Sequence, residues 1–160
     1  MLEIFNNLRP FFEDTFLEVS VRDYSRKINV SPPTASTILK KLEKENILVK
    51  EKKGIYLFFR INKDIFFKDL AKAYWRNTLS KLFKDIHEIF LYKQIILFGS
   101  VSKSENDLNS DVDIYIDLPK RNIDLKAKER ILKRKIQLHF IEVKKNKNLW
   151  KNIKRGIVIL

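Results

Sequence analysis

Two short motifs in the second half of the chain carry residue types that can bind a metal ion and a phosphate. Gly99 and Ser100 directly follow the apolar run 95–98, which predicts a strand that ends in a tight turn. Ten residues then separate Ser100 from Asp111 and Asp113, at the start of a second apolar run. Side chains two apart on a strand point to the same face, so both carboxylates can reach one hard cation such as Mg²⁺. The glycine lets a phosphate approach the backbone, and the serine can donate a hydrogen bond to it.

This arrangement resembles the nucleotidyltransferases of the DNA polymerase β superfamily, in their minimal prokaryotic branch. The match consists of Leu97-Phe98-Gly99-Ser100 and of Ser110 to Ile114, with the ten-residue gap of that family between Ser100 and Asp111. The resemblance implies that Asp111 and Asp113 are catalytic and hold Mg²⁺ or Mn²⁺, and that Gly99 and Ser100 bind a nucleoside triphosphate, with ATP favoured. A plainer alternative is a surface loop that leads into a strand with exposed acids.

The third strand of the resemblance departs from the family, which generally has a third carboxylate there for a second metal ion. In residues 136–143, Gln137 and His139 share the polar face where this carboxylate is expected. Glu142 would point to the opposite face of the strand unless a bulge intervenes, and Asp117 lies one strand away. Gln137 and His139 are therefore the candidates for a third-strand site. His139 can be a metal ligand or general base, or a hydrogen-bonded structural histidine.

Composition and charge exclude several kinds of site and indicate the class of binding partner. The chain has 160 residues, no cysteine and two histidines, which excludes disulfides and leaves zinc without its usual ligands. The formal net charge is +13, and residues 120–155 alone hold 14 Lys and Arg against 3 Asp and Glu. Such a segment can attract a polyanion, although a solvated basic surface is an equal alternative. Because no apolar stretch has transmembrane length and no signal peptide pattern opens the chain, we expect a cytoplasmic protein without membrane contact.

The first 61 residues resemble a winged helix-turn-helix domain. Helices are expected over 2–12 and 21–28, and Ser31-Pro32 predicts the start of a third helix that reaches about Glu45. A hairpin follows, with strands over 47–50 and 55–60 around a turn at Lys52-Lys53-Gly54. In such a domain the third helix enters the DNA major groove and the hairpin tip contacts phosphates, although winged helices also bind proteins. The DNA-binding candidates are Ser31, Thr34, Thr37, Lys40, Lys41, Lys52 and Lys53.

A long helical pattern over 64–92 follows, capped by Asn62 or Asp64, and is expected as one connector helix or two helices. Its aromatic residues either form the seam of a homodimer or pack on the sheet; they are Phe66, Phe67, Tyr74 and Trp75. His87 in this helix is expected to be structural. Beyond the Asp-x-Asp strand we expect a helix over 123–133, a helix from Asn146 to Gly156 and a short last strand over 157–160.

The sequence as a whole predicts an α/β (α+β) protein with a winged helix-turn-helix at 1–61, a connector helix at 62–93 and a mixed-sheet nucleotidyltransferase-like domain at 94–160. The implied reaction is Mg²⁺-dependent transfer of a nucleoside monophosphate, preferably from ATP, to a protein or RNA acceptor. By resemblance a protein acceptor would be the partner in a toxin–antitoxin pair. The alternative is a DNA-binding transcriptional regulator whose transferase-like domain is catalytically degenerate. A third, weaker alternative is an assembly factor whose basic C-terminal region holds RNA.

Overall fold

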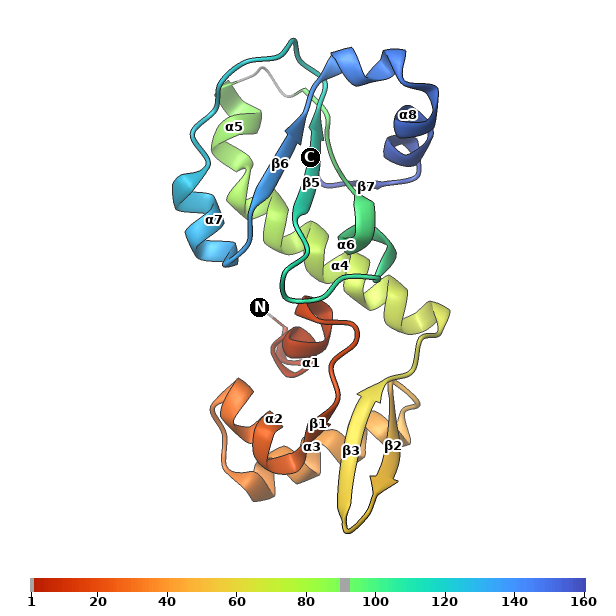
Figure 1. Cartoon of the computed structure of the whole chain (residues 1–160). Coiled ribbons are helices and arrows are strands. Elements are labelled where there is room, and N and C mark those ends of the chain that lie inside the picture. The colour runs from red at the N-terminus through yellow and green to blue at the C-terminus, as the bar shows by residue number, and fades with distance from the viewer. Residues whose placement is uncertain (1, 90–92) are drawn as a thin grey trace. The chain divides into compact units, whose positions relative to one another are not determined.

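The computed structural model describes residues 2–89 and 93–160. The chain forms two compact units, Met1–Ala71 and Lys72–Leu160, and each contains helices and one β-sheet. The fold is therefore of the α+β class, as predicted (Figure 1). The division between the units falls within helix α4 (Ile65–Leu82).

The first unit contains three helices and a three-stranded antiparallel sheet with the strand order β1-β3-β2. Its core is built from fully buried side chains of α1, α2, α3 and β3, among them Phe11, Tyr24, Leu39 and Phe59. Its elements in chain order are α1 (Glu3–Glu13), β1 (Val19–Ser20), α2 (Val21–Ile28), α3 (Pro32–Lys44), β2 (Leu48–Lys53) and β3 (Tyr56–Ile61).

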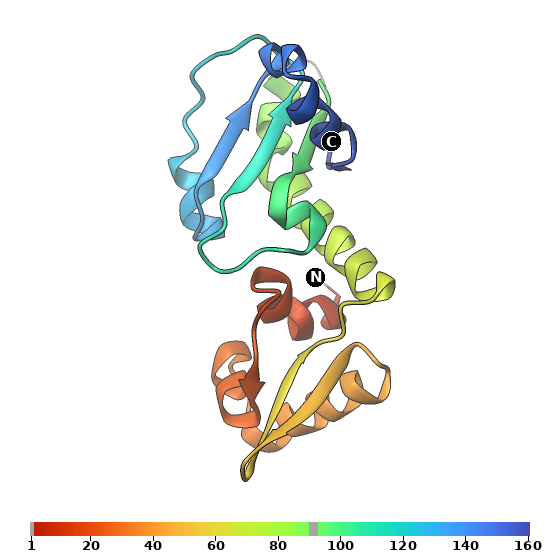
Figure 2. The same cartoon turned by 45° about the vertical axis from the view of Figure 1, so that its right-hand side comes forward.

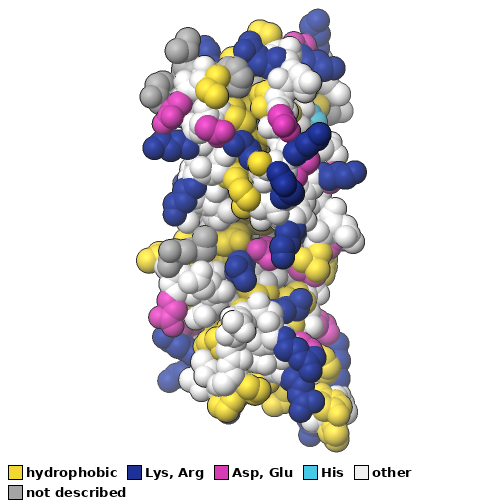
Figure 3. All heavy atoms as spheres, turned by 90° about the vertical axis from the view of Figure 1, so that its left-hand side faces the viewer, with side chains coloured by type: hydrophobic (Ala, Val, Ile, Leu, Met, Phe, Trp, Pro, Cys, Tyr) yellow, Lys and Arg dark blue, Asp and Glu magenta, His cyan; other side chains and the backbone are white. Residues whose placement is uncertain are grey.

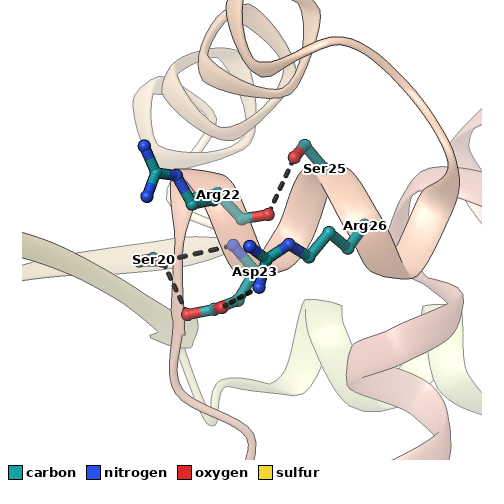
Figure 4. A network of polar contacts seen from close by, with 5 residues as sticks. All are labelled: Ser20, Arg22, Asp23, Ser25 and Arg26. Carbon is teal, nitrogen blue, oxygen red and sulfur yellow. Dashed lines mark hydrogen bonds and ion pairs between the residues drawn. The ribbon is translucent and has the colours of Figure 1, made fainter.

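Serine caps start α2 and α3. Ser31 Oγ accepts a hydrogen bond from Thr34 N (3.3 Å), and Pro32 occupies the first position of α3, where a missing N–H costs nothing. At the start of α2, Ser20 Oγ accepts from Asp23 N (3.2 Å) and donates to Asp23 Oδ2 (2.6 Å), as Figure 4 shows. Local sequence is thus sufficient to fix where both helices begin.

The hairpin turn lies later in the chain than predicted. Lys52 and Lys53 still belong to β2, because Lys53 pairs with Tyr56 across the hairpin. The turn is therefore Gly54-Ile55, and Gly54 has a φ of +63°, a value that glycine adopts without strain. The expected turn at Lys52-Lys53-Gly54 is wrong by about one residue because register, which depends on the partner strand, fixes the turn.

The second unit has a four-stranded mixed sheet with the order β6-β5-β4-β7, in which β5 and β6 are parallel and the other pairs antiparallel. Figures 1 and 2 show α5 and the second half of α4 along one face of this sheet, and α8 on the opposite face. After α4 its elements are α5 (Lys84–Ile89), β4 (Ile95–Phe98), α6 (Gly99–Lys103), β5 (Val112–Ile116), α7 (Lys126–Leu132), β6 (Ile136–His139), a 3₁₀ helix (Ile141–Lys145), α8 (Lys147–Lys154) and β7 (Ile157–Val158).

The expected third strand over 136–143 is too long. Strand β6 ends at His139, whose pairing with Tyr115 is the last in the β5–β6 ladder. Phe140 O then accepts a hydrogen bond from Val143 N (3.0 Å), which starts the 3₁₀ helix. The helix expected from Ile123 begins at Lys126, whose N–H donates to Asp124 Oδ1 (3.0 Å).

The long pattern over 64–92 forms two helices, α4 and α5, and its last residues, Phe90 to Tyr92, lie outside the described part of the chain. Asp64 Oδ1 caps α4 by accepting from Phe67 N (2.8 Å). Of the four aromatic residues considered for a homodimer seam, Phe67, Tyr74 and Trp75 are buried within the chain, and Phe66 is 56 % exposed. A seam built on all four is therefore wrong, because the other three pack in the interior.

Candidate functional site

Asp111 and Asp113 lie at the start of β5, in the middle of the four-stranded sheet. Asp113 is a strand residue and pairs with Phe98, the last residue of β4, while Asp111 immediately precedes the strand. Between them Val112 is fully buried, so the alternation along the strand directs the two carboxylates to the face opposite Val112, the face on which Tyr115 packs against Trp150. Asp113 keeps 24 % of its side chain exposed, and a ligand can reach it.

Gly99 lies directly against Asp113. Its φ is +76°, and a Cβ atom added to residue 99 would overlap Asp113 Oδ2 and lie 3.1 Å from Asp113 Cγ. Both the backbone conformation and the close approach therefore require glycine at this position. Ser100 follows in α6 and is partly exposed, so the Gly-Ser pair lies at the end of β4 with Gly99 against Asp113.

Gln137 and His139 on β6 face the two aspartates. Gln137 Nε2 donates to Asp111 Oδ2 (2.5 Å), and His139 Nε2 lies 3.4 Å from Asp113 Oδ1. The ring of His139 also packs edge-on against Phe98, with 4.9 Å between centroids. The parallel register of β5 and β6 produces these contacts, because Gln137 is paired with Asp113 and His139 with Tyr115. The polar face of the third strand thus points at the site, with an amide and an imidazole in place of a carboxylate.

The other two carboxylates considered for the third strand have different partners. Glu142 is the second residue of the 3₁₀ helix, and its Oε1 accepts a hydrogen bond from Lys120 N (3.0 Å). Asp117 accepts from Tyr115 Oη (2.6 Å) and from Lys144 Nζ (2.7 Å), and the bond with Lys144 contributes most to lowering its pKa. These bonds hold both carboxylates in structural roles.

Sequence reasoning missed Arg134. This residue is 8 % exposed, and its Nη1 donates to Asp107 O and Ser110 O, both at 2.7 Å. The two carbonyls belong to the segment just before Asp111, so Arg134 fixes the path of the chain into the site. Within that segment Asp107 Oδ1 also accepts from Ser110 Oγ (3.0 Å), the largest of the effects that lower the pKa of Asp107. No signal in the sequence separates Arg134 from its exposed neighbours Lys133 and Lys135.

The donor set suits a divalent cation that shares its coordination with a substrate. Mg²⁺ is commonly bound through one or two carboxylates, with waters and phosphate oxygens completing its octahedron. Asp111 and Asp113 could supply two hard oxygen ligands, and the Asp113 carboxylate lies directly against Gly99. Within residues 2–89 and 93–160, no group of three or more His, Cys, Asp or Glu side chains is placed to hold a metal ion.

The family model of the nucleotidyltransferase domain matches residues 79–159, which is half of the chain. The chain belongs to this family. The matched segment contains all six residues of the site, Gly99, Ser100, Asp111, Asp113, Gln137 and His139, and also Arg134. The resemblance seen in the Gly-Ser and Asp-x-Asp motifs is confirmed at the level of the domain.

A solved structure similar to this nucleotidyltransferase-domain protein is described as a possible transcriptional regulator from Methanosarcina mazei Go1. The two chains are 13 % identical with a TM-score of 0.39, and the similarity covers 55 % of this chain and 78 % of the other. Comparison with curated proteins gives no match. None of the helices in the described residues combines the length and the apolar character needed to span a bilayer.

The seven DNA-binding candidates of this nucleotidyltransferase-domain protein lie on α3 and β2 or next to them, and all seven are exposed. Three of them use their hydroxyls locally: Ser31 Oγ and Thr34 Oγ1 are 2.8 Å apart in the cap of α3, and Thr37 Oγ1 donates to Pro33 O (3.1 Å). Lys53 forms an ion pair with Glu18, whose hydrogen bond is the main cause that raises the pKa of Lys53. Sequence reasoning did not anticipate Glu18, which is 35 positions away.

Proposed function

We propose that the protein is a nucleotidyltransferase that transfers a nucleoside monophosphate from a nucleoside triphosphate, with ATP favoured, to an acceptor hydroxyl. The observation that carries the proposal is the close packing of Asp113 on Gly99, with Asp111 and Ser100 beside them, inside a domain of this family. Phosphate-binding and metal-binding groups are needed together for phosphoryl chemistry, and here they share one end of the sheet.

Asp111 and Asp113 would hold Mg²⁺ or Mn²⁺, and Gly99 N–H with Ser100 Oγ would bind the phosphates. The cation supplies neutralisation of the negative charge on the phosphates when it is bound. In the transfer the acceptor hydroxyl loses its proton, its oxygen bonds the α-phosphorus, and the bond to the bridging oxygen breaks as pyrophosphate leaves. His139, whose ring is held between Asp113 and Phe98, is the candidate to take that proton.

The test is incubation of the full chain with α-labelled ATP and Mg²⁺ in the presence of RNA and, separately, of protein acceptors. Transfer of label that disappears in Asp113→Asn supports an enzyme, because this change keeps the shape of the side chain and removes its charge. Removing such a charge should lower the rate by about 10² to 10³. Glu105→Gln is the matched control, since Glu105 is an exposed carboxylate in the loop between the two motifs. Equal transfer by Asp113→Asn and by the parent would refute the proposal.

A second candidate function is a DNA-binding regulator in which the transferase domain binds a nucleotide without turnover. Its support is the third strand, where Gln137 donates an amide hydrogen to Asp111 and no carboxylate faces the site. For DNA contact we propose that residues 1–61 act as a winged helix-turn-helix, with Ser31, Thr34, Thr37, Lys40 and Lys41 of α3 near base edges and Lys52 and Lys53 near phosphates. DNA binding that survives Asp113→Asn, together with no transfer to any acceptor, supports this function.

In the DNA-binding function, the two lysines near the hairpin turn differ in how readily they can contact a phosphate. Lys53 would have to leave Glu18 to contact a phosphate, whereas Lys52 has no ion pair to a carboxylate in the described residues. Lys52→Gln should therefore weaken DNA binding more than Lys53→Gln, with a fluorescence polarisation titration as the measurement. A homodimer remains a proposal that the same titration can examine through its stoichiometry.

A further inference from the structure

An open hollow of about 680 Å³ lies around α7, and its described lining residues are almost all basic. We call this surface the α7 hollow. Its described lining residues are Lys126, Glu129, Arg130, Lys133, Arg134 and Lys135. Figure 3 looks onto the face of the molecule that carries α7 and shows Lys and Arg side chains over it. A concave surface of one charge concentrates ions of the opposite charge.

The cations of the α7 hollow are available to a ligand. Lys126, Arg130, Lys133 and Lys135 are exposed, and none forms an ion pair with a carboxylate of residues 2–89 or 93–160. The one acidic lining residue is engaged elsewhere, because Glu129 Oε1 accepts a hydrogen bond from Ile136 N (3.0 Å). By contrast, the nearby Lys128 is paired with Asp85 (2.7 Å) and does not line the hollow.

The α7 hollow adjoins the nucleotidyltransferase site through the backbone. Lys135 O accepts from Val112 N (2.9 Å), and Arg134 Nη1 holds the carbonyls of Asp107 and Ser110. Two residues after Lys135, Gln137 contacts Asp111. The residues at the end of the hollow are thus bonded to the segment and the strand that carry the two aspartates, which suits an acceptor chain bound in the hollow.

The lining favours a nucleic acid over a protein partner. Cores of protein interfaces are depleted in lysine and glutamate and are anchored by aromatic or aliphatic side chains, which the described lining of the hollow lacks. Interfaces with nucleic acid are far more basic, and single strands lie in positively charged grooves. We propose that the α7 hollow binds the phosphodiester backbone of a single-stranded nucleic acid, which is the acceptor of the transfer reaction. The identification as acceptor rests on the proposed function, whereas the binding does not.

The test uses the full chain and a single strand of about 20 nucleotides, labelled at its 5′ end, as RNA and as DNA of the same sequence. The triple variant Lys126→Gln, Arg130→Gln, Lys133→Asn removes three charges from the hollow and leaves Arg134 in place. Asparagine is chosen at 133 because Lys133 has a φ of +54°, which asparagine tolerates. The matched control is Lys145→Gln, Lys147→Gln, Lys151→Gln, which removes three exposed charges from the same basic segment outside the hollow.

We expect the hollow variant to bind RNA at least about tenfold more weakly and to lower the salt slope of binding by roughly 2, while the control stays close to the parent. The strand that binds with the higher affinity, RNA or DNA, identifies the nucleic acid that the hollow binds. Equal loss in both variants, no loss in either, or preferential binding of a labelled polyglutamate peptide in the hollow overturns the proposal. Asp113→Asn separates the two proposals, because it should abolish transfer and leave strand binding unchanged. A variant whose thermal unfolding differs from the parent is replaced by the single change Arg130→Gln, which should still weaken strand binding and lower the salt slope by about 0.7, and an unchanged affinity and slope would overturn the proposal.

Discussion

Asp113 occupies the space in which a side chain at Gly99 would lie, since a Cβ atom on residue 99 would overlap Asp113 Oδ2. Gly99 and the carboxylate of Asp113 thus pack as one unit. Phe98 and Asp113 are paired across β4 and β5, which fixes this contact by register. Any residue other than glycine at position 99 must move the carboxylate.

Gly99→Ala should abolish nucleotide binding and destabilise the second unit. The positive φ costs about 1 kcal/mol for alanine, and the overlap with Asp113 adds about 1 to 3 kcal/mol. Gly54→Ala is the control, because Gly54 has a similar φ of +63° but a Cβ there would meet nothing within 4 Å. Chemical unfolding gives the two free energies, and titration with a fluorescent ATP analogue gives binding. Equal destabilisation by both changes would contradict a close Gly99–Asp113 contact.

Gln137→Glu should make the free energy of unfolding depend on divalent cations. The change replaces the amide that donates to Asp111 Oδ2 with a second carboxylate at hydrogen-bond distance, and we expect a loss of about 1 to 3 kcal/mol without metal. Mn²⁺ should restore this loss because three carboxylates then surround it. Thermal unfolding with and without Mn²⁺ is the measurement, and Gln137→Ala, which adds no charge, should gain much less from the metal. A melting temperature that Mn²⁺ raises equally in Gln137→Glu and Gln137→Ala would argue against Gln137 facing the cation site.

Local signals predicted those parts of the fold that depend on neighbours in sequence. Ser31-Pro32 places the start of α3 correctly because a capping hydroxyl and a proline act within one helical turn. The Gly-Ser motif follows one apolar strand and the Asp-x-Asp motif opens the next, and the antiparallel pairing of these two strands brings Gly99 and Asp113 together. The polar face of Gln137 and His139 followed from simple alternation along β6.

The parts that sequence reasoning missed depend on distant partners. Strand β6 ends early because the chain turns into a 3₁₀ helix after His139, and the hairpin turn shifts because Lys53 pairs with Tyr56. Arg134 looks like one more cation in a basic run until its bonds to Asp107 O and Ser110 O are seen. Register and long-range hydrogen bonds leave no trace in composition or periodicity.

Arg134→Met should loosen the segment that leads into Asp111. Two charge-assisted hydrogen bonds to the carbonyls of Asp107 and Ser110 would be lost, and we expect about 2 to 4 kcal/mol of destabilisation. Hydrogen exchange over residues 104–113 should increase at the same time. Arg130→Met is the control, because Arg130 lines the same hollow but is exposed. Unchanged exchange in Arg134→Met would show that the loop holds its path without this side chain.

Asp117 should make stability depend on pH at the acid end. Lys144, followed by the Tyr115 hydroxyl, lowers the pKa of Asp117 below its usual value of 3.8. The unfolded state therefore binds a proton more readily than the folded state, so this stabilisation is present above the usual pKa and is lost as pH falls through the folded pKa. We expect Asp117→Asn to lower the free energy of unfolding at neutral pH, and its difference from the parent to shrink below about pH 4.

Tyr115 should make the free energy of unfolding fall as pH rises at the alkaline end. Burial, followed by the hydrogen bond to Asp117, raises the pKa of Tyr115 from 10.0 to about 12. A raised pKa stabilises the fold fully below the unfolded value, and this contribution is lost as pH rises from about 10 toward 12. Tyr115→Phe should therefore remove the part of the alkaline decline that falls in this window. Urea unfolding followed by tryptophan fluorescence measures the free energy of unfolding at both the acid and the alkaline end. Lys144→Met keeps the Asp117 carboxylate but removes its cation, so this variant should show a smaller loss of stability at acid pH. A constant difference between Tyr115→Phe and the parent from neutral pH to pH 12 would contradict the buried phenol as its source.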